Sequence, residues 1–219
     1  MPQQKKLFVL LIGIVLTAGL LFATQIKQAR NIVINPTKEP IINTNLTDIP
    51  LGATDQILGN PGSPLTLVLF ADLGCAECQT VYYSISKFIT SHPQEARLFF
   101  KDAPSTGWFS DGNILAHQAA YCAGKQNKFW QFIDLVMKEK TNLKEAGLKK
   151  TAEALQLNTG AWWQCASSEE AKNYVADNAS LAQALGIKTI PALFINNKKI
   201  NLTSDIDLAE MLNKFITKE

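Results

Sequence analysis

The chain has 219 residues, of which 47% are hydrophobic and 18% are charged, and its formal net charge is +2. These values are typical of a globular protein with a hydrophobic core, and the length fits one domain with an appendage. The charge is small and no basic stripe is interleaved with aromatic residues, so we expect no nucleic-acid partner.

A hydrophobic segment stands near the start of the chain. Lys5 and Lys6 precede residues 7–23, in which Thr17 is the one residue that is neither apolar nor glycine. The segment is as long as the shortest bilayer spans (about 17–25 residues) and longer than the apolar core of a signal peptide (about 7–15 residues). No small-x-small cleavage site accompanies it, so we expect residues 1–24 to be an uncleaved signal anchor, with a signal peptide as the alternative.

The anchor predicts a single-pass protein of the cell membrane. The two lysines place the short N-terminal tail in the cytoplasm, and the catalytic part then lies on the periplasmic or extracellular face. Residues 25–61 are rich in Asn, Thr and Pro without a sustained period, so we expect an extracytoplasmic linker, within which an edge strand is the alternative. A dense turn signal at residues 59–64 marks the entry into a folded domain of residues 62–219.

A Cys-x-x-Cys pair, Cys75 and Cys78, follows a segment that reads as a buried strand, residues 65–70, and precedes a predicted helix at 81–89. Two thiols at the start of a helix lie one turn apart, so they can interconvert between dithiol and disulfide. The helix N-terminus favours a negative charge on the first sulfur, which makes it a nucleophile.

Two other interpretations of the pair are half of a zinc site and two buried cysteines without chemistry. A zinc site needs further ligands, and the remaining candidates form no second close pair: His92, His117, Cys122 and Cys165. Small and polar neighbours argue against a core position. We therefore expect a redox site with no metal and no cofactor.

The rest of the chain alternates strands and helices, which predicts an α/β fold. The expected order is a strand at 96–101, a helical region at about 112–185, two strands at 192–196 and 199–201 joined by a turn at Asn196–Asn197, and a helix from an N-cap at Asp205 to Ile216. Ser167 to Glu170 has a capping-box pattern that predicts the start of one helix, and Gly186 predicts its end.

Three segments together resemble the DsbA-like thiol:disulfide oxidoreductases of the thioredoxin superfamily: residues 70–78, 119–130 and 185–196. The resemblance covers roughly residues 60–219. It implies an α/β thioredoxin-like fold with a helical insertion and a catalytic pair at Cys75 and Cys78. It also implies that Pro191 is a cis-proline and that the backbone of Ile190 binds a substrate strand.

Two positions depart from the family pattern. Leu69 stands six residues before the first cysteine, where members of the superfamily often carry a buried acid. Ala76 and Glu77 lie between the cysteines, where oxidising members typically have proline and histidine. We expect this dipeptide to tune the redox site, because a carboxylate next to Cys75 disfavours its thiolate.

The predicted function is disulfide exchange with exported cysteine-containing proteins, in the oxidising direction, with a membrane redox partner that recharges the site. The alternatives are a membrane-linked thiol reductase and a non-enzymatic peptide-binding module. Cys122 and Cys165 both lie in the helical region of an exported chain with an even number of cysteines, so we expect a structural disulfide. Two separate core residues are the alternative.

Overall fold

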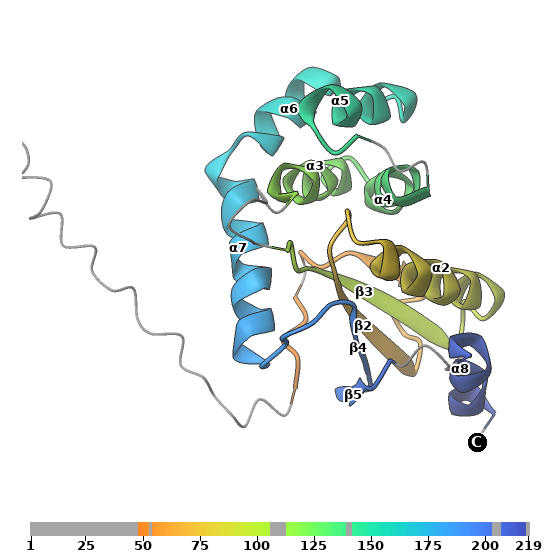
Figure 1. The fold of residues 1–219 in the computed structure, drawn as a ribbon. Coiled ribbons are helices and arrows are strands. Elements are labelled where there is room, and N and C mark those ends of the chain that lie inside the picture. Colours follow the sequence, from red (N-terminus) through yellow and green to blue (C-terminus); the bar gives the residue numbers. More distant parts are fainter. Residues whose placement is uncertain (1–47, 53, 106–112, 139–141, 203–206, 218–219) are drawn as a thin grey trace, which may run out of the picture. The chain divides into compact units, whose positions relative to one another are not determined.

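The computed structural model describes residues 48–52, 54–105, 113–138, 142–202 and 207–217. The predicted anchor and most of the predicted linker lie outside these residues. Within the described ranges, no helix is both long and apolar enough to cross a membrane. The elements, labelled in Figure 1, are β1 (Ile57–Gly59), β2 (Leu65–Ala71), α2 (Ala76–Ser91), β3 (Ala96–Asp102), α3 (Ile114–Gly124), α4 (Phe129–Lys138), α5 (Glu145–Ala154), α6 (Thr159–Ala166), α7 (Glu169–Ala184), β4 (Ala192–Ile195), β5 (Lys198–Ile200) and α8 (Leu208–Ile216).

The described strands form one mixed sheet in the order β1-β3-β2-β4-β5. Strand β2 is parallel to β3, and α2 connects the two, whereas the other neighbouring strands pair antiparallel. Asn196 and Asn197 join β4 to β5 with φ angles of 46° and 64°. A two-residue hairpin of this kind requires positive φ at both positions, and asparagine tolerates it better than most residues.

Alternate residues of the central strand β2 enter two different hydrophobic cores. Leu67 and Leu69 belong to the larger core, which includes buried residues of α2, α3 and α8. Val68 and Phe70 belong to the smaller core, which Ala182 of α7 joins from the other face. Side chains of a strand point to opposite faces in turn, so a strand covered on both faces reads as a continuous apolar run. This explains why residues 65–70 are apolar apart from Thr66.

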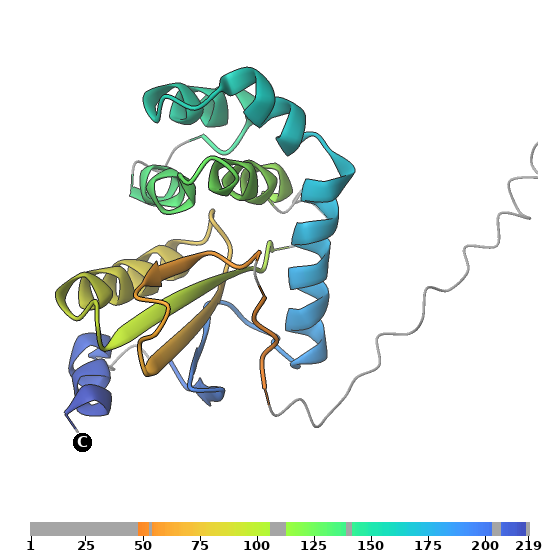
Figure 2. The ribbon, with the colours of Figure 1, turned by 180° about the vertical axis from the view of Figure 1, so that it is seen from behind.

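Helices α3 to α7 form the helical insertion between β3 and β4, as predicted. In both views the shorter helices of the insertion lie at one end of the sheet, and α7 runs along the sheet on the side away from α8 (Figure 2). Trp162 of α6 is fully buried against α3, and its Nε1 donates to the carbonyl of Ala119 at 2.9 Å. The α/β thioredoxin-like fold with a helical insertion is confirmed.

The boundaries differ from the prediction in three places. We predicted a linker at residues 25–61, with an edge strand within it as the alternative, and strand β1 is such an edge strand. The folded part of the chain therefore includes residues before the predicted domain start at residue 62. Ser168, rather than Ser167, is the N-cap of α7 and accepts from the N–H of Ala171. Asp207 is the N-cap of α8 and accepts from the N–H of Glu210, while the predicted cap, Asp205, lies outside the described residues.

Candidate active site

Cys75 and Cys78 stand where the chain leaves β2 and enters α2. Cys75 is the N-cap of α2, with φ −87° and ψ 119°, and its sulfur accepts a hydrogen bond from the backbone N–H of Cys78 at 3.1 Å. Both cysteines are free; Cys75 is half-buried and Cys78 is fully buried. An N-cap position exposes the sulfur to unpaired N–H groups of the first helical turn, which stabilise a negative charge. The geometry therefore suits an accessible nucleophile with a second thiol one turn behind it.

Burial makes the second thiol hard to ionise. It raises the pKa of Cys78 well above its ordinary value, and the hydrogen bond with Cys75 acts in the same direction. The backbone N–H of Asp72 lowers this pKa, but the charge of the Asp72 carboxylate raises it. Cys78 is thus a neutral thiol at neutral pH, chiefly because it is buried, and the charge of Asp72 adds a smaller effect in the same direction.

The predicted substrate-binding residues, Ile190 and Pro191, lie directly before β4. The peptide bond between them is cis. Strand β4 pairs with β2, so that Ala192 stands opposite Phe70, close to the end of β2 that leads to the cysteines. The structure thus brings two of the three segments of the family resemblance, residues 70–78 and 185–196, side by side.

Ile190 and Pro191 also line a surface pocket of about 570 Å³. Residues of the first two turns of α2, including Glu77 and Val81, form the facing wall, and the start of α8 closes it. Ala76 and Glu77 are both exposed, and Glu77 lines the same pocket as the proline. This is a concave site whose walls carry both polar and apolar side chains.

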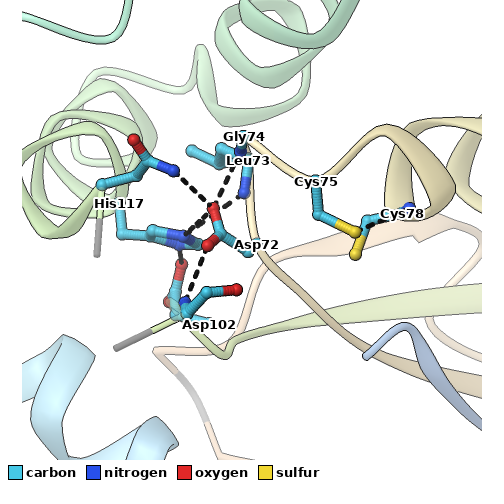
Figure 3. Close-up of polar contacts among 9 residues, drawn as sticks. Asp72, Leu73, Gly74, Cys75, Cys78, Asp102 and His117 are labelled. Carbon is cyan, nitrogen blue, oxygen red and sulfur yellow. Dashed lines mark hydrogen bonds and ion pairs between the residues drawn. The ribbon is translucent and has the colours of Figure 1, made fainter. Parts of the chain in front are cut away.

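A buried cluster that the sequence did not predict lies on the other side of the active-site loop: Asp72, His117 and Asp102 (Figure 3). The Asp72 carboxylate accepts from the N–H groups of Gly74 at 2.8 Å and Ser105 at 2.7 Å, and from Asn113 at 3.1 Å. Burial alone would raise the pKa of Asp72, but the hydrogen bonds, first of all with His117, hold it well below its ordinary value. Asp72 therefore carries a negative charge at neutral pH.

His117 of α3 lies between the two carboxylates. Its Nδ1 is 2.6 Å from Asp102 Oδ1, and its Nε2 is 3.6 Å from Asp72 Oδ1. Burial opposes the cation, but the bonds to Asp102 and Asp72 raise the pKa of His117 to about 9. This pKa favours a protonated ring at neutral pH. Nδ1 donates to Asp102, and Nε2, which faces Asp72, also lies 3.4 Å from the backbone N of Leu73.

Sequence reasoning missed this cluster because it looked for an acid at Leu69, which is fully buried in the larger core. A usable signal was present. Asp72 and Asp102 each end a predicted strand, and the parallel register places Asp102 beside Ala71. The carboxyl ends of parallel strands meet at one edge of a sheet, so the sequence would have allowed the proximity of the two acids to be predicted.

The remaining two cysteines are joined in the structure. Cys122 of α3 and Cys165 of α6 form a disulfide with a Cα–Cα distance of 5.8 Å. In the part of the chain that the structure describes, no group of three or more His, Cys, Asp or Glu side chains has the arrangement of a metal site.

A dithiol at a helix N-terminus, beside a cis-proline that opens a neighbouring strand of a mixed sheet, defines a thioredoxin-type oxidoreductase. A family model described as thioredoxin matches residues 52–214. The chain belongs to this family, and it resembles the DsbA-like thiol:disulfide oxidoreductases.

Individual relatives agree with this assignment. The probable disulfide bond formation protein D of Bacillus anthracis is 27% identical over 177 residues, which are 76% of this chain and 79% of that protein. The crystal structure of the thiol-disulfide exchange protein alpha-DsbA2 from Wolbachia pipientis superposes with a TM-score of 0.66 at 18% identity, over 81% of this chain and 93% of that chain.

A further relative is much longer. The Na(+)/H(+) antiporter NhaA 3 of Salinispora tropica is 24% identical over 145 residues, which are 66% of this chain. The match spans 22% of the antiporter's length.

Proposed function

We propose that the protein exchanges disulfides with exported cysteine-containing proteins, with Cys75 as the attacked sulfur and Cys78 as the resolving one. The observation that carries the proposal is the asymmetry of the pair: Cys75 is half-buried at the helix tip, and Cys78 has no exposed surface. In this scheme the pocket beside Ile190 and Pro191 holds the extended substrate segment.

In the oxidising direction, a substrate thiolate attacks the Cys75 sulfur of the Cys75–Cys78 disulfide. The bond between the two cysteines breaks, and Cys78 leaves and takes up a proton. A second substrate thiolate then attacks the substrate sulfur of the mixed disulfide and releases the Cys75 thiolate. Two electrons pass from substrate to protein, and a membrane redox partner accepts them to restore the disulfide.

We favour the oxidising direction because hydrogen bonding at the helix N-terminus stabilises the Cys75 thiolate, the released group of the second step. Glu77 supports the second candidate, a thiol reductase, since a carboxylate in the first turn of α2 opposes that thiolate. We also propose that the domain lies outside the cytoplasm, tethered by residues 7–23. The Cys122–Cys165 disulfide supports this location, because structural disulfides persist mainly in oxidising compartments.

Thiol trapping of the full chain in isolated membranes tests both direction and location. An oxidant is expected to hold Cys75 and Cys78 mostly as a disulfide in growing cells, and a reductase to hold them mostly as thiols. A Cys75→Ser variant gives the reference for a chain that cannot form this disulfide. Recovery of the protein solely in the soluble cytoplasmic fraction would contradict the tether. A static disulfide that exchanges with neither insulin nor glutathione would favour a peptide-binding module.

A further inference from the structure

His117 is a buried ionisable residue on a helix made largely of small apolar residues. Its side chain has no exposed surface. Burying a charged ring is costly unless partners compensate for the lost water, and here two carboxylates do so. Asp102 is itself anchored by Asn178 of α7, whose side chain donates to Asp102 Oδ2 at 3.0 Å. The ring therefore ties α3 to the ends of two strands, β2 and β3.

Asp72 connects this cluster to the redox site. Its carbonyl accepts from the N–H of Cys75 at 3.1 Å, and its carboxylate accepts from the N–H of Gly74. The same residue therefore shapes the turn that presents Cys75. Its backbone N–H lowers the pKa of the Cys78 thiol, whereas its carboxylate charge is the smallest of the influences that raise this pKa.

Cys78 must nevertheless become a thiolate whenever it resolves a mixed disulfide, because the thiolate is the attacking species. An uncompensated carboxylate near it would slow this step. The His117 cation lies against the Asp72 carboxylate and offsets that charge.

We propose that His117 is a positioning residue for the resolving step: by bridging Asp72 and Asp102, it offsets the carboxylate charge near Cys78 and fixes the turn that carries Cys75. The inference rests on the proposed roles of the two cysteines. It gives the helical insertion a part in positioning the redox site, beyond covering the sheet.

The test is oxidation of the reduced protein by glutathione disulfide, followed by acid quenching and mass spectrometry. The Cys75 thiolate attacks glutathione disulfide and releases one glutathione; the Cys78 thiolate then attacks the Cys75 sulfur and releases the second. The rate of mixed-disulfide formation is proportional to the glutathione disulfide concentration, whereas the rate of the resolving step is independent of it. The two rates can therefore be measured separately. In His117→Gln the resolving rate is expected to fall roughly threefold or more, the scale of coupling within one polar network. The mixed disulfide then accumulates.

Trp162→Phe is the matched control. It removes a buried hydrogen bond between α6 and α3 and leaves Asp72 and its partners in place. It is expected to lower stability without changing the resolving rate. In an Asp72→Asn background, His117→Gln is expected to lose most of its effect, because the charge to be offset is gone.

An unchanged resolving rate in His117→Gln, or an equal change in Trp162→Phe, would overturn the proposal. If His117→Gln does not fold, Asp72→Asn alone decides: a faster resolving step supports the proposal, and a slower or unchanged one overturns it. Failure of the proposed function looks different, since Cys75 of the unmodified protein would then form no mixed disulfide with glutathione at all.

Discussion

Folding stability should depend on pH through His117. The pKa of this buried ring is about 9 in the folded protein against an ordinary value of 6.5. A group whose pKa is higher in the folded than in the unfolded protein stabilises the fold. This stabilisation is complete when the pH is below the pKa of the unfolded protein, and it is lost as the pH rises through the pKa of the folded protein. Each pKa unit corresponds to about 1.4 kcal/mol, so the contribution is about 3 kcal/mol below pH 6.5 and declines towards pH 9.

The charged neighbours of the ring do not reverse this sign. The pKa of Asp72 is lowered, so its own contribution is present above its ordinary value of 3.8 and is lost at more acid pH. Tyr174 of α7 has a pKa raised by burial and by the charge of Asp102, so it stays protonated across the neutral range. Between pH 6 and pH 8.5 the free energy of unfolding should therefore fall by about 2 kcal/mol.

The assay is guanidinium unfolding at pH 6 and pH 8.5 with the active-site disulfide formed, so that Cys75 and Cys78 do not titrate. His117→Gln is expected to be less stable at pH 6 and to lose most of the slope. His92→Gln is the matched control, because the His92 ring contacts the Phe88 carbonyl rather than a carboxylate. A slope that persists in His117→Gln would refute the assignment of a buried histidine cation.

Three further predictions concern the structural disulfide, the active-site cysteines and Glu77. Replacing both Cys122 and Cys165 by alanine opens a loop with a sequence separation of 43, which should cost about 4 kcal/mol in urea unfolding; an unchanged stability would contradict the disulfide. A bulky maleimide should label Cys75 but not the fully buried Cys78 in the reduced native protein, and equal labelling would contradict the asymmetry. Glu77→His should make the protein more oxidising in a glutathione titration, by about 30 mV for each 1.4 kcal/mol of thiolate stabilisation. An unchanged or more reducing potential would show that Glu77 does not tune the site.

The strands and the cysteine pair could be predicted because their signals are local. Residues 65–70 are apolar apart from Thr66, since both faces of β2 are covered, and the two cysteines follow that strand closely. The hairpin at Asn196–Asn197 was predicted for a similar reason, because its turn chemistry lies in two adjacent residues.

The Asp72–His117–Asp102 cluster could not be predicted in the same way. In the sequence, His117 is 44 positions from Leu73, whose backbone N lies near the ring. It is 15 positions from Asp102, whose side chain contacts the ring. Its position depends on how α3 packs against the ends of β2 and β3, and a histidine in an apolar helix has no local signal of its partners. The prediction also missed the exact first residues of helices. Ser167 and Ser168 are adjacent and chemically identical, and only the backbone conformation makes Ser168 the N-cap of α7.

The most direct test of the central claim is trapping of the mixed disulfide. Cys78→Ala is incubated with insulin, whose disulfides serve as the probe, and the products are separated without reductant and mapped by mass spectrometry. Disulfide exchange through Cys75 predicts a stable adduct between Cys75 and an insulin chain, and no adduct in Cys75→Ala/Cys78→Ala. A Cys78→Ala protein that forms no adduct, while it remains folded, would contradict the assignment of Cys75 as the exchanging sulfur.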